Sequence, residues 1–220
     1  MMKKVCAVLV ALIAIVGLSL GVANAQTISN GGFEQDLNNW SGGFGAANIY
    51  PPSGVTPDPN LIHGGAKSMY TVATTGTGDF WMARFQQFSV TPGQLLSMSG
   101  WVRPVINAAA ETMRGGIGIF YFDSAGTQLL GLEKQAEVSN ANNNNWTQLN
   151  VSDTVGADLG IARAQFTVWA WAASYDRGDA ATSRVYFDDI SGGVVPEPSS
   201  LILLGSGVLG MLGISRKKKA

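Results

Sequence analysis

The sequence predicts an all-β domain, built as an antiparallel β-sandwich, between two targeting segments. Short runs rich in apolar and β-branched residues recur along its middle, and turn residues separate them. No long helical pattern interrupts these runs, so a parallel sheet with connecting helices is not expected. Only 13% of the residues are charged and 28 are glycine, a composition typical of β-rich extracellular domains.

The N-terminal segment, residues 1–25, has the pattern of a secretory signal peptide. A positively charged start precedes an apolar run, and small residues lead to a predicted cleavage between Ala25 and Gln26. The only cysteine, Cys6, lies inside this segment. We therefore expect a mature protein without disulfide bonds, although secretion would allow them.

Five segments of the predicted domain, residues 26–193, have strand character. They are residues 80–90, 94–103, 115–122, 146–151 and 161–171. Between the two targeting ends the chain holds eight Lys and Arg against fourteen Asp and Glu, a net charge of about −6. Nucleic acid is therefore not an expected partner, because its binding depends on cationic side chains that neutralise phosphates.

The C-terminal segment, residues 194–220, has three parts in a fixed order. Pro196, Glu197 and Pro198 form a stiff, non-helical boundary. An apolar run over residues 201–214 follows, and a cluster of four basic residues ends the chain. As a helix, the apolar run would span about 21 Å, short of a bilayer core of roughly 30 Å. An ordinary tail anchor is the alternative interpretation, with the basic end on the cytoplasmic side.

Together these three parts resemble the PEP-CTERM sorting signal of Gram-negative bacteria that make exopolysaccharide. The resemblance implies secretion across the inner membrane and transient insertion of the tail in that membrane. It further implies processing near Pro196–Pro198 by an exosortase-type membrane protease, and a final place at the cell surface or in the extracellular matrix. The signal concerns the address of the protein and assigns no activity to it.

Three motifs of the predicted domain occur in an order that indicates a second resemblance. They are Asn-Gly-Gly-Phe-Glu at 30–34, the run 86–93 that leads into Ser-Gly-Trp-Val at 99–102, and Val-Tyr-Phe-Asp-Asp-Ile at 185–190. In this order they resemble jelly-roll carbohydrate-binding modules of the galactose-binding-domain-like superfamily. The resemblance implies a jelly-roll sandwich without catalytic activity, and it leaves the glycan open.

The same resemblance implies a structural Ca²⁺ ion between the first and last strands. Its ligands would be Glu34 and Asp188, with main-chain carbonyls around Gly32 and Lys67. Such hard oxygen donors suit Ca²⁺. In the alternative, Glu34 caps a turn and Asp188 or the adjacent Asp189 pairs with an arginine. Strand alternation points the two aspartates to opposite faces, so only one of them can reach the ion.

Alternation also selects candidates for a polysaccharide-binding face, where aromatic rings stack on sugars and polar groups bind hydroxyls. In the runs 94–103 and 161–171, the apolar positions are expected to face the core. The candidates at the other positions are Trp101, Arg103, Gln165, Trp169 and Trp171. In the alternative, loops cover this face and the rings form a second small core. Trp81 has the opposite parity to Arg84 and Gln86, so these three cannot share a face without a bulge.

Three functional hypotheses follow from the sequence. The first is a secreted, non-catalytic surface protein that binds polysaccharide or exopolysaccharide. The second is a structural surface or matrix protein without sugar recognition. The third is a glycoside hydrolase that uses an acid pair, Asp176 with Asp179 or Asp188 with Asp189. The third is disfavoured because the chain has one histidine, His63, and no nucleophile, zinc or phosphate-binding motif.

Overall fold

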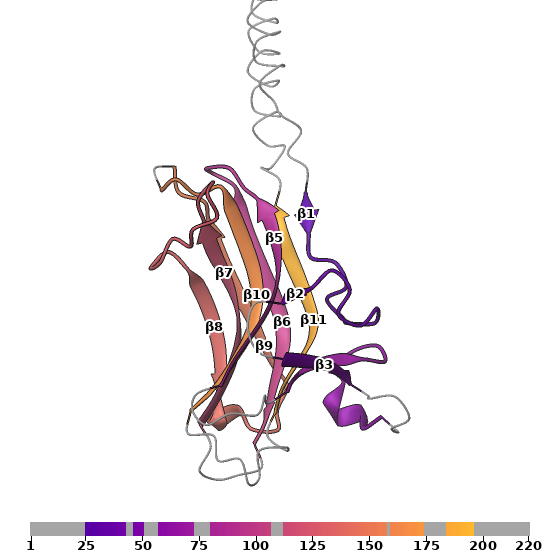
Figure 1. Ribbon diagram of the computed structural model, residues 1–220. Helices are drawn as coiled ribbons and strands as arrows, with labels where there is room; N and C mark the ends of the chain where they lie inside the picture. Colours follow the sequence, from indigo (N-terminus) through magenta and orange to yellow (C-terminus); the bar gives the residue numbers. More distant parts are fainter. Residues whose placement is uncertain are drawn as a thin grey trace, which may run out of the picture. The chain divides into compact units, whose positions relative to one another are not determined.

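The structure is a computed structural model. It describes residues 25–42, 46–50, 57–72, 80–106, 112–157, 159–173 and 184–195. The compact unit Gln26–Val195 consists of two antiparallel β-sheets packed face to face (Figure 1). Residues 1–24 of the predicted signal peptide and nearly all of the predicted sorting segment lie outside the described residues. No helix within the described ranges has the length and apolar character needed to cross a membrane.

The first sheet has six strands, in the order β3-β4-β11-β6-β9, and β1 also pairs with β11. The strands are β1 (Gln26–Thr27), β3 (Ala46–Tyr50), β4 (Ser68–Val72), β6 (Leu95–Val105), β9 (Thr147–Thr154) and β11 (Arg184–Val195). The first strand of the unit therefore lies beside the last one, with Gln26 opposite Val194.

The second sheet has five strands, in the order β2-β5-β10-β7-β8. The strands are β2 (Ser41–Gly42), β5 (Phe80–Ser89), β7 (Thr112–Phe122), β8 (Lys134–Ser139) and β10 (Arg163–Ala173). Two single-turn 3₁₀ helices complete the elements, η1 (Pro59–Leu61) and η2 (Asn140–Asn142). The predicted antiparallel sandwich is confirmed, and the five predicted segments correspond to β5, β6, β7, β9 and β10.

The core lies between the sheets and follows the alternation along the central strands. On β10, Phe166 and Val168 are fully buried, as are the three alanines at even positions. On β6, Leu96, Met98 and Val102 face the same interior from the opposite sheet. Burial of each large apolar side chain contributes about 1.5–3 kcal/mol, so one register of each strand is strongly favoured. The odd positions of β10 and β6 are consequently directed outward.

A β-bulge interrupts the pairing of β11 with β6 between Asp188 and Ser191. Asp189, inside the bulge, has a φ of 49°, and Gly192, directly after it, has a φ of 139°. A Cβ atom on residue 192 would overlap the carbonyl oxygen of Ser97 on β6. This position therefore requires glycine both for its backbone conformation and for the close approach of the neighbouring strand.

Substitution of Gly192 tests the importance of this close approach. We expect Gly192→Ala to lower the free energy of unfolding by about 3 kcal/mol or more, because backbone strain and overlap with β6 both oppose the new methyl group. Gly126→Ala is the matched control, since Gly126 has a φ of 86° but nothing within 4 Å of an added Cβ. The control should lose only about 1–2 kcal/mol. Equal losses in urea unfolding would contradict the contribution of the bulge contact.

Candidate functional site

Three tryptophan side chains gather on the outer face of the five-stranded sheet. Trp81 on β5 lies directly opposite Trp171 on β10, and Trp169 lies two residues before Trp171 on the same strand. The ring centroid of Trp81 is 6.3 Å from that of Trp169 and 6.3 Å from that of Trp171. We call Trp81, Trp169 and Trp171 the tryptophan platform.

The three rings of the platform differ sharply in exposure. Trp81 is 55% exposed, Trp171 is partly buried, and Trp169 is only 7% exposed. The indole edge of Trp169 lies against β7, where an added Cβ on Gly116 would come within 2.8 Å of its Cζ2 atom. Glycine at this position therefore lets the Trp169 ring approach the sheet. Trp81 is consequently the ring with the most surface available to a ligand.

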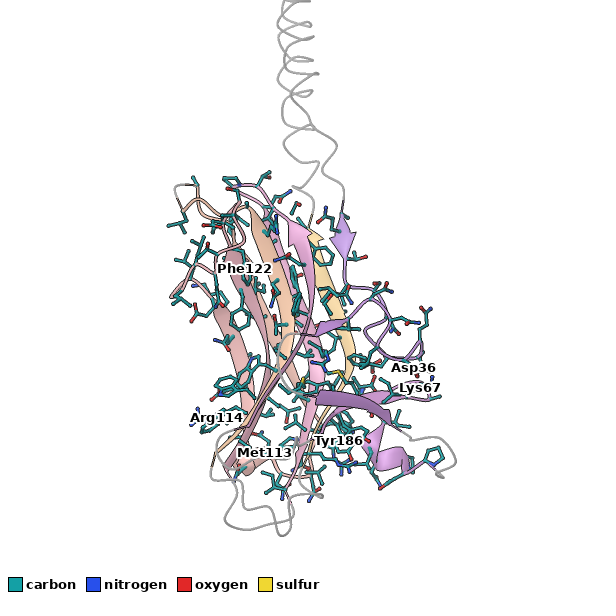
Figure 2. The ribbon with its side chains drawn as sticks, viewed as in Figure 1. Asp36, Lys67, Met113, Arg114, Phe122 and Tyr186 are labelled. Atoms are coloured by element: carbon teal, nitrogen blue, oxygen red, sulfur yellow. The ribbon has the colours of Figure 1, made fainter. Side chains whose placement is uncertain are left out.

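Polar groups border the platform on the side of β7 and β8. The Arg114 guanidinium carbon lies 5.8 Å from the Trp171 ring centroid, in the range of a cation–π contact. Arg114 Nη1 also lies 3.2 Å from Glu137 Oε1, and both side chains are about half exposed. In the register of the sheet, Arg114 is opposite Trp171 and Glu137 is opposite Gly116. Figure 2 shows Arg114 and Phe122 near the two ends of β7.

The predicted residue Gln165 lies on the same outer face but farther along β10. It is four positions from Trp169, roughly 14 Å at 3.4 Å per residue. Its Nε2 donates to Thr167 Oγ1 at 3.3 Å. Gln87 on β5 is its partner in the register and is exposed. The outer face of the second sheet therefore extends from aromatic rings at one end of β10 to amide side chains near the other.

The two other predicted residues, Trp101 and Arg103, do not belong to this face. Both lie on β6, in the six-stranded sheet, with their side chains on its outer side. The prediction of one polar face carrying Trp101 together with Trp169 and Trp171 is therefore wrong. Alternation correctly directed all of these side chains outward, but it could not assign the strands to sheets.

The segment 57–67 covers Trp101 and Arg103. The imidazole of His63 stacks on the Trp101 ring with centroids 3.9 Å apart and an interplanar angle of 18°. Arg103 donates a hydrogen bond to the Asn60 carbonyl, and Trp146 Nε1 donates to the same oxygen at 2.9 Å. The rings here form a second small cluster, which was the alternative that the sequence left open.

Asp188 is fully buried beneath the same segment and is tied to its main chain. Its Oδ2 accepts hydrogen bonds from the N–H groups of His63 at 2.9 Å and Gly64 at 3.1 Å, and its Oδ1 accepts from Asp189 at 2.8 Å. Burial raises the pKa of the Asp188 carboxyl to about 6, although the three N–H donors act in the opposite direction. The Asp188 carboxylate thus holds the main chain of residues 63 and 64 against β11.

Glu34 holds the other end of this loop. Its Oε1 accepts from the N–H groups of Ala66 at 2.7 Å and Lys67 at 3.1 Å. Asp189, redirected by the bulge, places its Oδ2 2.7 Å from His63 Nδ1. The predicted calcium residues Glu34 and Asp188 therefore both contact the segment 63–67, which contains Lys67. Their carboxylates accept hydrogen bonds from main-chain N–H groups, and neither pairs with an arginine of the described ranges.

Gly32 lies beside this group of carboxylates. An added Cβ there would be 3.8 Å from Asp189 Oδ1 and 4.0 Å from Glu34 Cγ. Within the described ranges, no three His, Cys, Asp or Glu side chains are close enough together to hold a metal. A Ca²⁺ ion at this place would therefore need main-chain carbonyls as well as carboxylates, a mixture of hard oxygens that Ca²⁺ accepts.

A shallow hollow of about 310 Å³ lies elsewhere, on the outer face of the six-stranded sheet. Serine, asparagine and small apolar residues of β6, β9 and β11 line it, among them Ser97, Ser99, Asn150 and Ser191. Its lining contains no charged or aromatic side chain. The hollow is therefore separate both from the tryptophan platform and from the carboxylates around residues 63–67.

Sequence reasoning did not include Trp81, Arg114 and Glu137 among the candidates. It did separate Trp81 from Arg84 and Gln86 by parity, and the structure agrees, because Gln86 is buried and bonded to Ser29. The missing information was which strands are neighbours. Trp81 and Arg114 reach Trp171 only because β5 and β7 flank β10.

Comparisons with known proteins bear on both the tail and the fold. The family model of the PEP-CTERM protein-sorting motif matches residues 194–217, which confirms the predicted sorting signal. This motif marks a secreted protein that is sorted to the cell surface. No curated protein sequence matches the chain.

Several solved structures of carbohydrate-binding modules are similar to the chain. A structure of TmCBM61 in complex with β-1,4-galactotriose is 15% identical, covers 75% of this chain and 95% of its own, and has a TM-score of 0.47. A family 16 module is 18% identical, with coverages of 75% and 97% and a TM-score of 0.48. The C-terminal family 22 module of Clostridium thermocellum Xyn10B is 18% identical, with coverages of 78% and 98% and a TM-score of 0.47.

The two adjacent aspartates allow a matched test of the loop anchor. We expect Asp188→Asn to lower the free energy of unfolding by about 1–3 kcal/mol, because the amide places an N–H donor against a buried N–H. Asp189→Asn should lose less than about 1 kcal/mol, since asparagine tolerates a positive φ and this side chain is exposed. Urea unfolding at neutral pH measures both. Equal effects would show that Asp188 does not anchor the loop.

Proposed function

We propose that the protein is a non-catalytic, polysaccharide-binding protein of the cell surface, and that it binds its ligand on the tryptophan platform. The observation that carries the proposal is the exposed indole of Trp81, held on the outer face of the second sheet by two further tryptophans. A contiguous group of apolar rings that remains open to solvent is characteristic of binding surfaces, whereas single exposed apolar side chains are common.

The chemistry of this face suits a sugar chain. An indole offers a flat apolar surface to the C–H face of a pyranose ring, and its partner rings fix its position. Arg114 and Glu137 beside the platform can donate to and accept from sugar hydroxyls. Gln87 and Gln165, farther along the same face, add amide groups that do both. A chain of several sugar units could therefore contact rings and polar groups in succession.

The placement of the acidic residues supports a binding function without catalysis. Asp188 is fully buried and Asp189 contacts His63, both on the six-stranded sheet and away from the platform. The other acid pair that the sequence suggested, Asp176 and Asp179, lies outside the described residues. Arg114 and Glu137 pair with each other, so the described part of the platform offers no pair of carboxylates for glycoside hydrolysis.

The sorting motif supports the location in this proposal. Exosortase processing near Pro196–Pro198, after transient insertion in the inner membrane of a Gram-negative bacterium, would release the domain to the surface or the matrix. The polysaccharide available there would be the exopolysaccharide of the cell. A purely structural matrix protein, the second hypothesis from the sequence, would have the same address but no use for an exposed tryptophan platform.

We further propose that a structural Ca²⁺ ion binds at Glu34 and Asp188, with carbonyl oxygens around Gly32 and Lys67. Three carboxylates meet one short loop here, and one of them is fully buried. A cation at this place would compensate the desolvation that raises the pKa of Asp188. It would also link the first and last parts of a domain without disulfide bonds.

Removal of the Trp81 ring tests the binding function. We expect Trp81→Ala to weaken binding of a polysaccharide ligand tenfold or more, about 1.4 kcal/mol, in affinity electrophoresis against a broad panel of soluble glycans. Leu130→Ala is the control, because Leu130 is exposed and apolar but lies in the loop after β7. If the unmodified protein binds no glycan in the panel, the binding function is wrong.

Chelation tests the calcium proposal. Removal of Ca²⁺ should lower the melting temperature by roughly 5–10 °C, since a free ion at a hundred times its Kd stabilises by about 2.7 kcal/mol. Glu34→Gln should abolish this response, and Asp36→Asn, which alters a nearby exposed carboxylate, should retain it. An unchanged melting temperature after verified removal of the metal would count against the site.

A further inference from the structure

We propose that the tryptophan platform selects neutral glycan chains over acidic ones, and that Glu137 is the positioning residue that sets this selectivity through Arg114. The inference rests on the proposed function and adds the charge class of the ligand. Arg114 and Glu137 are both exposed, take no part in the core and lie at the border of the tryptophan platform.

The geometry around Arg114 carries the proposal. Its guanidinium lies 5.8 Å from the centroid of Trp171 and 3.2 Å from a Glu137 carboxylate oxygen. The planar fork of an unpaired arginine beside an aromatic surface would bind a sugar carboxylate with two hydrogen bonds. Glu137 already uses one of these donors and places a negative charge at the same position. The remaining N–H groups of Arg114 can still donate to uncharged hydroxyls.

A second observation indicates that a ligand oxygen belongs near this pair. Trp169 is 7% exposed, yet its indole Nε1 has no acceptor among the described residues. Buried N–H groups nearly always have a partner. The edge of the indole next to this nitrogen lies over Gly116, the residue opposite Glu137 in the register. The nitrogen itself is covered in this structure, so an oxygen from outside the domain would complete this donor once the groups over it move, beside the carboxylate that would accept a sugar hydroxyl proton.

The surrounding charge favours the same class of ligand. Among the described residues, the next charged residue along the outer face of β10 is Arg163, eight positions from Trp171, or roughly 27 Å at 3.4 Å per residue. That separation is well beyond a Debye length of about 8 Å. The segment 26–195 carries a net charge of about −6. A polyanionic chain would therefore meet a compensated arginine on a domain of like charge, whereas a neutral chain would meet no such penalty.

The test compares neutral chains with acidic versions of the same chains. Soluble glucan, galactan and mannan, and the C6-oxidised form of each, serve as probes in affinity electrophoresis with the protein at low salt. The unmodified protein should bind at least one neutral chain and bind its oxidised form at least tenfold more weakly. Glu137→Gln should raise affinity for the oxidised form about tenfold, with neutral binding changed less than about threefold. Arg114→Gln combined with Glu137→Gln should remove this gain.

Asp36→Asn provides a control for net charge alone. Asp36 is exposed and pairs with Lys67 at 2.7 Å, so the substitution also frees a cationic partner. This pair lies on another part of the domain from Arg114 (Figure 2). Because asparagine accepts the φ of 58° at this position, the fold should be retained. The control should show no gain for oxidised chains, and melting temperatures confirm that all variants are folded.

The outcomes separate this inference from the function on which it rests. Equal binding of neutral and oxidised chains by the unmodified protein would overturn the selectivity. A Glu137→Gln variant without the gain, or an Asp36→Asn variant with the same gain, would overturn the role of Glu137. Failure of the unmodified protein to bind any neutral or oxidised chain would instead overturn the proposed function, and the selectivity with it.

Discussion

The alternation of side chains along β10 is the constraint on which the rest of the structure depends. β10 is the central strand of its sheet, and its even positions are filled by small or apolar residues that are fully buried. A slip by one residue would bring Trp169 and Trp171 into the core and expose Phe166 and Val168. The same apolar burial that stabilises the sandwich therefore determines that the two tryptophans point outward.

Features that depend on neighbouring residues in the sequence were predicted better than features that depend on contacts between distant parts of the chain. Alternation within one strand is local, so the inward residues of β6 and β10 were predicted correctly, as was the separation of Trp81 from Gln86. Assignment of strands to sheets depends on contacts between distant parts of the chain, and therefore Trp101 was grouped with Trp169 although β6 and β10 belong to different sheets. Plain alternation was expected at Asp188 and Asp189, whereas a bulge interrupts β11 there and turns both side chains toward the segment 63–64.

The two outer faces of the sandwich differ in how far the described residues cover them. On the six-stranded sheet, the segment 57–67 lies over Trp101 and is held by hydrogen bonds to Asp188 and Glu34. Aromatic rings there stabilise a loop. On the five-stranded sheet, the exposed indole of Trp81 remains open to solvent. The same residue type therefore packs against a loop on one side and remains open to solvent on the other, and burial of the individual ring distinguishes the two cases.

The pairing of β11 with its neighbours has a mechanical consequence. The strand ends at Val195, directly before Pro196, so a force applied to the chain after residue 195 would enter the domain through β11. β6 pairs with β11 over nearly its whole length on one side, while β4 and β1 pair with other parts of it. A force parallel to these strands loads many hydrogen bonds together, in shear, and does not open them one at a time. A domain pulled through its last strand in this way would resist unfolding.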